Sequence, residues 1–396
     1  MHVLLIARCP PYPLHLGDRL IVYHLGRELA RLGHVIDLLA FSDDPAADWA
    51  ARDHYADFFD HIELIAEPPR SVASYLRRLI VPGSRWPRAE SAAWSPEMWR
   101  AIRARLESGG YDVAHLFGGV QVYEYRYALG DLPTIITPYE SYSLYLRRAL
   151  AAERRPADAL RWLMAQAYER WMFTPYRRVI VVSDRDRAAL HGLNLALPLT
   201  VIPNGVDLER FQPPDPAAQA RESAVLLFTG NYSYAPNRDA ALYLAESILP
   251  RVRAQIPAAR LWLVGSDPPP ELLALHGDHI AVTGYVPDVR PYVQRATVFV
   301  SALRFGAGIK NKVLEALALG CPVAATPLSV DGIAVTDGHD ALIADGDALV
   351  GAVLRLLSDA DLRARLAVNG RRLIAARYSW GQVAAQYTQI YAEISG

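Results

Sequence analysis

A glycine-rich loop that carries two lysines is the segment of this sequence best suited to bind phosphate. Residues 304–312 read Arg-Phe-Gly-Ala-Gly-Ile-Lys-Asn-Lys. The glycines allow backbone N–H groups to approach a phosphate, and a helix that begins near Lys310 adds free N–H groups and the positive end of its dipole. Lys310 and Lys312 are the only lysines among the 396 residues. Their concentration in one loop predicts a diphosphate site, and a glycine-rich turn with solvated lysines is the alternative.

One carboxylate follows this loop at a position suited to holding a ribose. Glu315 lies one turn into the predicted helix, between the apolar pairs 313–314 and 316–317. Burying a carboxylate is costly unless it accepts hydrogen bonds, and the two hydroxyls of a ribose would donate them. A structural ion pair is the alternative. Together with the lysines, Glu315 predicts a site for a nucleoside diphosphate.

The elements that must position these residues alternate between short strands and longer helices, which is typical of βαβ units in a parallel sheet. A turn-forming cluster at 203–207 separates two such series. We therefore predict an α/β protein of two Rossmann-like, doubly wound domains that face each other across a cleft. The N-terminal domain spans 1–205 and is completed by a helix over 380–396, and the C-terminal domain spans 206–379. The predicted strands are Val3–Ala7, Val35–Phe41, Ile62–Ala66, Val113–Phe117, Thr134–Thr137, Val179–Val182, Val225–Phe228, Leu261–Val264, Ile280–Val282, Val298–Val300 and Pro322–Ala325.

Apolar periodicity predicts two helical regions in the N-terminal half. One helix is expected over Arg19–Leu32, and one long helical stretch over Leu144–Tyr176. In the C-terminal half, Asp345-Gly346-Asp347 is interpreted as a helix cap rather than as a metal-binding Asp-x-Asp motif.

Composition and charge restrict the class of protein. Hydrophobic residues make up 52% of the chain and charged residues 21%, as in a folded globular protein. Lys and Arg number 41 against 42 Asp and Glu, and the net charge of -1 argues against a nucleic-acid binder. Cys9 and Cys321 lack metal-site or redox spacing. The sequence shows no signal peptide and no apolar run of about 18 residues, so we expect a cytoplasmic protein.

Five short motifs follow one another at Val201–Asp207, Phe228–Gly230, Leu263–Gly265, Val282–Val286 and Lys312–Val323. In their order and spacing they resemble those of the family 4 glycosyltransferases, and the resemblance covers nearly the whole chain. It is closest to the branch found with exopolysaccharide clusters. It implies the GT-B fold, a nucleotide held by the C-terminal domain, retention of anomeric configuration and no need for a metal. The nucleotide-diphosphate sugar is then a co-substrate, and no cofactor is expected.

The resemblance also assigns roles to individual residues. Glu315 corresponds to the carboxylate that binds the ribose, and Gly17 to the glycine beside the donor phosphate. His115 matches a histidine at a strand end that faces the cleft, and a buried core histidine is the alternative. The expected catalytic residues are His115, Arg238, Lys310 and Lys312. The expected donor-binding residues are Gly17, Gly230, Asn231, Gly265, Tyr285, Val286, Gly306, Gly308, Ile309, Asn311 and Glu315, and the expected acceptor-binding residues are Tyr139 and Glu140.

Three positions depart from the family pattern. Ala307 stands where many members have a second glutamate that contacts the donor sugar. Asn231 begins a segment, 231–238, in which relatives carry an arginine and a lysine. In this sequence the segment has one cation, Arg238. Tyr139 occupies a cleft position that is often histidine. Recognition of the sugar must therefore rest on backbone groups or other side chains, and Lys310 and Lys312 would supply the missing charge.

Two arginine-rich stretches lie outside the predicted donor site. One covers 144–176, and the other covers 70–105 and includes Arg77, Arg78, Arg85 and Arg88 together with Tyr75 and Trp86. A solvated helical face is one interpretation. The other is a surface that meets anionic lipid, which predicts peripheral membrane contact and a lipid-linked acceptor in place of a free sugar.

The expected function is transfer of a hexose from a nucleotide-diphosphate sugar to a hydroxyl acceptor, in polysaccharide or glycolipid synthesis. A nucleotide-sugar epimerase of the same fold and a non-catalytic nucleotide-sugar-binding subunit are the alternatives. A dinucleotide dehydrogenase is disfavoured, because residues 10–13 read Pro-Pro-Tyr-Pro where Gly-x-Gly-x-x-Gly is needed.

Overall fold

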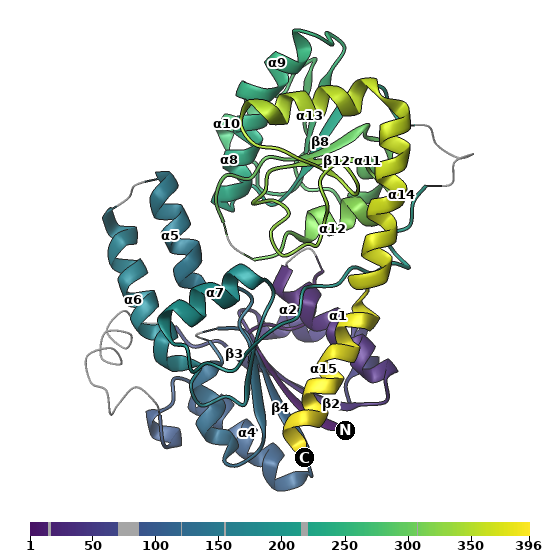
Figure 1. The fold of residues 1–396 in the computed structure, drawn as a ribbon. Coiled ribbons are helices and arrows are strands. Elements are labelled where there is room, and N and C mark those ends of the chain that lie inside the picture. Colours follow the sequence, from purple (N-terminus) through teal and green to yellow (C-terminus); the bar gives the residue numbers. More distant parts are fainter. Residues whose placement is uncertain (15–16, 70–86, 120, 154–155, 215–220, 307) are drawn as a thin grey trace. The chain divides into compact units, whose positions relative to one another are not determined.

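The chain divides into two compact units, each with its own parallel sheet (Figure 1). The computed structural model describes residues 1–14, 17–69, 87–119, 121–153, 156–214, 221–306 and 308–396. Unit 1 comprises Met1–Asn204 and Trp380–Gly396, and unit 2 comprises Gly205–Ser379. The chain therefore leaves unit 1 once and returns to it with its last helix.

Unit 1 is built on seven parallel strands in the order β3-β2-β1-β4-β5-β6-β7. The order reverses between β1 and β4, and ligands of such sheets bind beyond the carboxyl ends of the strands at this point. The strands are β1 (His2–Ala7), β2 (Val35–Ser42), β3 (His61–Ala66), β4 (Val113–Phe117), β5 (Thr134–Thr137), β6 (Arg178–Val181) and β7 (Leu199–Val201). The helices are α1 (Gly17–Arg31), α2 (Pro45–Ala50), α4 (Pro96–Ser108), α5 (Tyr142–Glu153), α6 (Pro156–Met172), α7 (Asp184–Leu193) and α15 (Trp380–Ser395), with short 3-10 turns at Arg52–His54, Ala56–Phe58, Glu90–Ala92 and Tyr123–Leu129.

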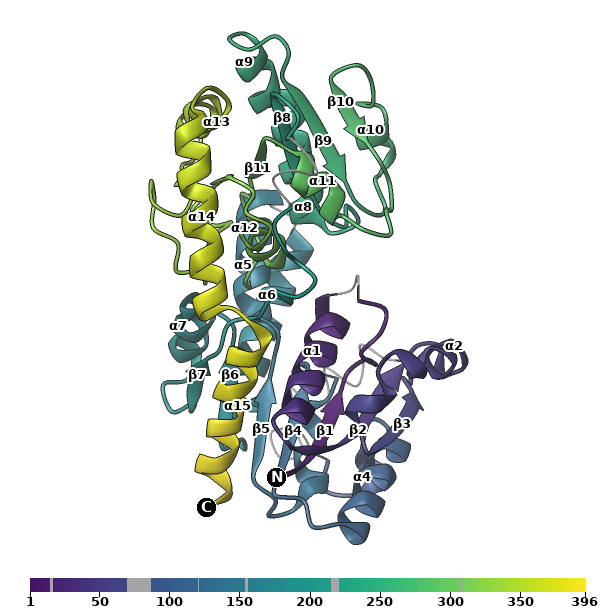
Figure 2. The same ribbon diagram turned by 90° about the vertical axis from the view of Figure 1, so that its right-hand side faces the viewer.

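Helices cover both faces of the sheet of unit 1. Successive side chains of a strand point to opposite faces, so Val3 and Leu5 face α1 and α15, whereas Leu4 and Ile6 face α4, α6 and α7. Helices α1 and α15 lie side by side on their face (Figures 1 and 2). The C-terminal helix is therefore part of the core of unit 1.

Unit 2 repeats this architecture with six parallel strands in the order β10-β9-β8-β11-β12-β13. Its order reverses between β8 and β11, which places the expected ligand position beyond the ends of these two strands. The strands are β8 (Val225–Thr229), β9 (Arg260–Val264), β10 (Ile280–Val282), β11 (Val298–Ser301), β12 (Val323–Ala325) and β13 (Leu342–Ile343). The helices are α8 (Ala235–Tyr243), a π-helical turn over Leu244–Ile248, α9 (Leu249–Arg253), α10 (Pro270–Leu273), α11 (Arg290–Arg295), α12 (Asn311–Ala318), α13 (Asp347–Ser358) and α14 (Ala360–Arg377).

The predicted class of two parallel α/β domains is confirmed, and the differences are local. The short strands β7 and β13 were not predicted. The stretch 144–176 holds two helices, α5 and α6, and Pro156 is the first residue of the second. Prolines favour the first turn of a helix, where no backbone N–H is needed. The helix cap predicted at 345–347 is present, since Gly346 is the cap residue of α13 with φ +52°, although no side chain accepts a hydrogen bond there.

Candidate functional site

Gly230, Gly265 and Gly284 follow the neighbouring strands β8, β9 and β10 of unit 2, and their backbones lie close together. The N–H of Gly230 donates to the Val264 carbonyl at 3.1 Å, and the N–H of Gly265 donates to the Gly284 carbonyl at 3.3 Å. Gly265 has φ +149°, and a Cβ atom there would lie 1.8 Å from the Gly230 carbonyl oxygen. Only glycine fits at 265, so the carboxyl edge of the sheet is bare backbone at this point.

Lys312 points to this edge from the first turn of α12. Its Nζ donates to Asn237 Oδ1 at 2.6 Å and lies 4.3 Å from the centre of the Phe228 ring. A Cβ atom on Gly230 would come within 2.8 Å of the same Nζ. Asn237 in turn donates from Nδ2 to the Asn231 carbonyl at 2.8 Å. The lysine is therefore held beside the glycine turn that follows β8.

Lys312 and Glu315 are two half-buried ionisable residues of α12 whose charges influence each other. Burial lowers the pKa of Lys312 to about 7, and the positive charge of Lys310 adds to this effect. The negative charge of Glu315 acts in the opposite direction. Burial raises the pKa of Glu315 to about 7, against the charges of Lys312 and Arg210. Among the hydrogen bonds of the described residues, none ends on the Glu315 carboxylate. A ligand that brings an anion to Lys312 and hydroxyl donors to Glu315 would stabilise the charged form of each.

The loop between β11 and α12 is anchored at both ends. Arg304 Nε donates to Asp239 Oδ2 at 2.9 Å, and its guanidinium lies 4.8 Å from the centre of the Tyr243 ring. At the other end, Lys310 Nζ donates to the Gly308 carbonyl, and α12 begins at the next residue. The predicted helix start near Lys310 is thus close to the observed one. Ala307, the position of the missing family glutamate, lies outside the described residues.

Polar residues beneath this loop were not found from the sequence. Ser301 Oγ donates to Ser329 Oγ at 2.9 Å, Ser329 Oγ accepts from the Leu303 N–H at 3.2 Å, and Thr326 Oγ1 donates to the Leu303 carbonyl at 2.7 Å. These buried hydroxyls fix the start of the loop. Ser301, a polar residue that ends an otherwise apolar strand, is the signal that would have indicated them.

The other predicted donor residues are distributed along the same edge. Arg238 in α8 lies 3.9 Å from Glu271, so its charge is partly matched by α10. Asn231 Oδ1 accepts from the N–H of Ser233 at 2.8 Å and closes the turn after β8. Tyr285 and Val286 follow β10, two strands from β8, and Tyr285 is 61% exposed. Lys310, Lys312 and Glu315 lie together on and before α12, whereas Tyr285 follows Gly284 at the end of β10 with an exposed side chain. Two neighbours of these residues were not predicted, namely Asn237, which accepts a hydrogen bond from Lys312, and Arg210, whose charge acts on Glu315.

His115 lies in the core of unit 1, in conflict with its predicted catalytic role. It occupies the middle of β4 and is 0% exposed. Its Nδ1 is 2.7 Å from the Tyr391 hydroxyl and its Nε2 is 2.8 Å from Thr137 Oγ1, so both ring nitrogens have partners. Burial lowers the pKa of His115 to about 3. His115 therefore joins β4, β5 and α15 as a neutral side chain. This agrees with the alternative interpretation, a buried core histidine.

We expect His115→Gln to reduce stability and leave turnover unchanged. Loss of the ring leaves buried hydroxyls without good partners and should cost about 1 to 3 kcal/mol. Because the pKa of His115 is lower in the folded state, its contribution is present above its unfolded pKa of about 6.5 and is lost as the pH falls towards 3. Chemical denaturation at several pH values between 3 and 6.5 measures how the free energy of unfolding depends on pH. The variant should lack the part of this dependence that comes from His115. Unchanged stability with a large fall in kcat would contradict the core role.

The predicted acceptor residues Tyr139 and Glu140 follow β5, and Tyr139 contacts residues at the ends of β4 and β1. The ring of Tyr139 lies 5.2 Å from that of Phe117, and burial, followed by the neighbouring Cys9, raises the tyrosine pKa well above its usual value. Arg8 pairs with Asp18 of α1 at 3.3 Å. Gly17 is exposed at the start of α1. These groups surround the point between β1 and β4 at which the strand order of unit 1 reverses.

Glu140 precedes a network that joins three helices. The N–H of Ser141 donates to Asp186 Oδ1 at 3.0 Å, and Ser183 Oγ donates to Asp186 Oδ2 at 2.5 Å. Glu169 of α6 accepts from the N–H of Tyr142 at 2.7 Å, at the start of α5. Burial raises the pKa of Glu169 to about 7, against these hydrogen bonds. The segment that carries Tyr139 and Glu140 is therefore held by α6 and α7.

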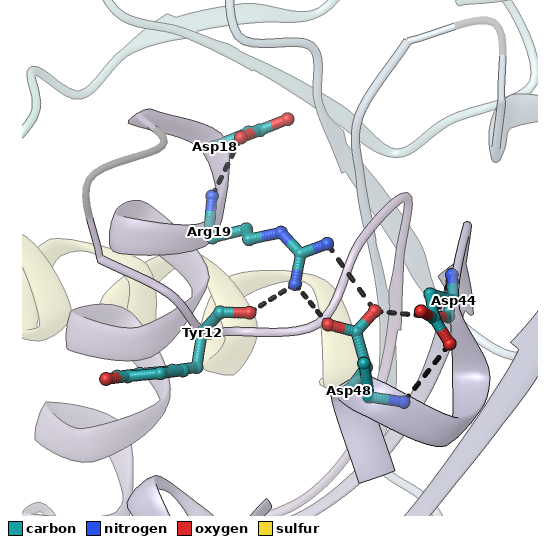
Figure 3. Close-up of polar contacts among 7 residues, drawn as sticks. Tyr12, Asp18, Arg19, Asp44 and Asp48 are labelled. Atoms are coloured by element: carbon teal, nitrogen blue, oxygen red, sulfur yellow. Dashed lines mark hydrogen bonds and ion pairs between the residues drawn. The ribbon is translucent and has the colours of Figure 1, made fainter. Parts of the chain in front are cut away.

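Arg19 holds the loop that follows β1 (Figure 3). Its guanidinium donates to the Tyr12 carbonyl and to Asp48, with Nη1 2.7 Å from Oδ1 and Nη2 3.4 Å from Oδ2. Ser42 Oγ donates to Asp48 Oδ2 at 2.5 Å. The side chains of Arg19 and Asp48 are 12% and 11% exposed, so the pair is largely protected from water. It connects α1, α2 and the proline-rich loop.

We expect Arg19→Met to lower the free energy of unfolding by about 1 to 3 kcal/mol, because Asp48 keeps its charge and loses its main partner. Denaturant unfolding measures the change. In the double variant Arg19→Met/Asp48→Asn part of the loss should be recovered, since no unpaired carboxylate remains. Additive losses in the two single variants and the double variant would show that the two side chains are not coupled.

Solved structures define the fold class of the chain. Sucrose-phosphate synthase from Thermosynechococcus elongatus matches with a TM-score of 0.74 at 21% identity, over 99% of this chain and 98% of that one. HepE from Anabaena, solved in complex with UDP and glucose, matches with a TM-score of 0.65 at 15% identity, over 99% of each chain. Both sheets of this chain therefore belong to the GT-B fold.

Sequence comparison gives the family. The model described as "Glycosyltransferase Family 4" matches residues 20–210, and the model "Glycosyl transferases group 1" matches residues 223–359. The lipopolysaccharide core biosynthesis mannosyltransferase LpcC of Rhizobium leguminosarum bv. viciae is 25% identical over 246 residues, which cover 58% of this chain and 68% of that protein. The chain belongs to the family 4 glycosyltransferases, as its motifs indicated.

Proposed function

We propose that this chain is a retaining hexosyltransferase that uses a nucleoside-diphosphate sugar and a hydroxyl acceptor in polysaccharide or lipopolysaccharide synthesis. The observation that carries the proposal is Lys312 beside the glycine turn after β8, with the carboxylate of Glu315 one turn further along α12. A relative named as a lipopolysaccharide core mannosyltransferase and a structural neighbour solved with UDP and glucose support the choice of pathway and donor.

The proposed chemistry is largely electrostatic. When the anomeric bond breaks, negative charge grows on the β-phosphate and positive charge on the sugar. Lys312, Lys310 and the N–H groups at the start of α12 stabilise the departing diphosphate, so no metal or cofactor enters the proposal. Glu315 accepts hydrogen bonds from the ribose. The acceptor hydroxyl attacks the face that the phosphate leaves, and its proton passes to a phosphate oxygen.

The acceptor is proposed to bind unit 1 beyond β1, β4 and β5, near Tyr139 and Glu140. A lipid-linked acceptor remains part of the proposal. Of the arginines that suggested it, Arg77, Arg78 and Arg85 lie outside the described residues, and Arg88 is exposed. None of the helices in the described ranges has the length and apolar character needed to cross a bilayer.

A panel of nucleoside-diphosphate sugars tests the proposal. A donor should raise the melting temperature with its concentration, because ligand that binds only the folded state stabilises it. The same donor should then yield a glycosylated acceptor with the anomeric configuration kept, as read by NMR. Binding with neither transfer nor hydrolysis would favour a non-catalytic subunit, interconversion of sugars would favour an epimerase, and no binding by any donor would overturn the proposal.

A further inference from the structure

The outer face of α6 carries three large apolar side chains in water. Leu160 is 63% exposed, Leu163 58% and Trp171 42%. At about 100° per residue these positions fall within about 80° of one another around the helix, and exposed Ala167 lies between them. Single exposed apolar residues are normal on protein surfaces, whereas a continuous stripe marks an interaction site. We call these four residues the α6 stripe.

Positive charge borders the α6 stripe on both sides. Arg161 and Arg170 are exposed on the same helix, and Arg147 is exposed on the neighbouring α5. Within 159–172, where the side chains of α6 are described, Glu169 is the only acid, and it is 4% exposed and turned to the start of α5. The exposed surface of this part of α6 therefore combines apolar and cationic side chains without an exposed carboxylate.

The helix pair that carries the α6 stripe is firmly attached to unit 1. Helices α5 and α6 lie side by side (Figures 1 and 2). Met172 and Phe173 at the end of α6 are buried in the core cluster. Glu169 ties the two helices through the N–H groups of Tyr142 and Ser143, at 2.7 and 3.3 Å. The stripe is thus carried by a helix whose end is anchored in the core of unit 1.

We propose that the α6 stripe docks on an anionic phospholipid bilayer. Leucines enter the interfacial region, an indole favours its boundary, and arginines meet the phosphate headgroups. Charge favours a bilayer over a second copy of the chain. In a two-fold dimer through the stripe, the arginines of one copy would approach those of the other. The inference is independent of the donor chemistry, because it concerns only where the enzyme is held.

Sedimentation with vesicles tests the proposal. Vesicles of phosphatidylcholine with roughly 30 mol% phosphatidylglycerol should bind the protein at low salt, and added salt should weaken the binding by screening. The double variant Leu160→Asn/Leu163→Asn should reduce the partition coefficient at least about tenfold. The reason is that two apolar side chains, which would be buried in the bilayer, are replaced by polar ones. Arg161→Gln/Arg170→Gln should reduce binding to anionic vesicles and have little effect on weak binding to phosphatidylcholine alone.

A matched control is available on unit 1. Leu195 is 85% exposed between α7 and β7, and Leu195→Asn should bind vesicles as the wild type does. Melting temperatures verify that each variant is folded, and all sites are exposed enough for the fold to tolerate them. Wild-type protein that stays in the supernatant, or equal binding by the double leucine variant, overturns the proposal. A dimer that dissociates in that variant, without vesicle binding by the wild type, would show that the stripe joins two copies instead.

Discussion

Replacement of Lys312 by methionine is expected to lower kcat by about 10²- to 10³-fold and to raise the donor KM much less. A cation beside the diphosphate stabilises charge that grows towards the transition state, so its loss acts mainly on turnover. Methionine fills a similar volume beside Phe228 and removes the charge. Steady-state rates with varied donor measure the effect, and wild-type turnover in the variant would show that the lysine is only structural.

The melting temperature of Lys312→Met distinguishes a loss of function from misfolding. The pKa of Lys312 is lower in the folded state than in the unfolded chain, so burial of its charged form costs stability. This cost is complete below pH 7 and is relieved as the pH rises from about 7 towards the unfolded value of about 10.4. Lys312→Met should therefore raise the melting temperature of the ligand-free protein at neutral pH. Lys310→Met is the control within the loop and should lower kcat less, because Lys310 Nζ is bonded to the Gly308 carbonyl.

The sequence could predict features that depend on local pattern. Apolar runs give the buried strands of a parallel sheet, and the motif around Lys312 and Glu315 locates the start of α12. Strands of three and two residues, β7 and β13, carry too little pattern to be recognised. The division between α5 and α6 was missed although Pro156 could have indicated it, because the apolar periodicity continues on both sides.

Contacts between residues far apart in sequence could not be predicted in this way. Lys312 meets Asn237 across 75 residues, and His115 meets Tyr391 across 276. The family resemblance placed His115 at a cleft, whereas the arrival of α15 on that face of the sheet encloses it. A histidine in a strand is compatible with either position until the packing of the last helix is known.

Replacement of Glu315 by glutamine is expected to weaken nucleoside diphosphate binding by about 1 to 3 kcal/mol, because charge-assisted hydrogen bonds to the ribose become neutral ones. A 2′-deoxyribose analogue is the matched probe. It should bind the wild type more weakly than the ribose form, and Glu315→Gln should distinguish the two less. Calorimetry measures all four affinities. Equal discrimination by both proteins would contradict the assignment of Glu315 to the ribose.

The same variant should stabilise the ligand-free protein. The pKa of Glu315 is raised in the folded state to about 7, so the folded chain holds a proton that the unfolded chain releases above pH 4.5. Stability therefore falls as the pH rises from 4.5 to 7, and glutamine removes this penalty. At pH 8 the gain should be about 1 to 3 kcal/mol, since one unit of pKa shift corresponds to about 1.4 kcal/mol.

Donor affinity should in consequence pass through a maximum near pH 7. Below it Glu315 must lose a proton to accept the ribose hydroxyls, so binding releases a proton and strengthens as the pH rises. Above it Lys312 must gain a proton to meet the diphosphate, so binding takes up a proton and weakens as the pH rises. Glu315→Gln should lose the acid limb, and Lys312→Met the alkaline limb.

Calorimetry in two buffers of different ionisation enthalpy should detect proton release on donor binding at pH 6 and proton uptake at pH 8. Equal heats in the two buffers at both pH values would show that neither side chain titrates on binding, because each would then already carry its charge in the free protein.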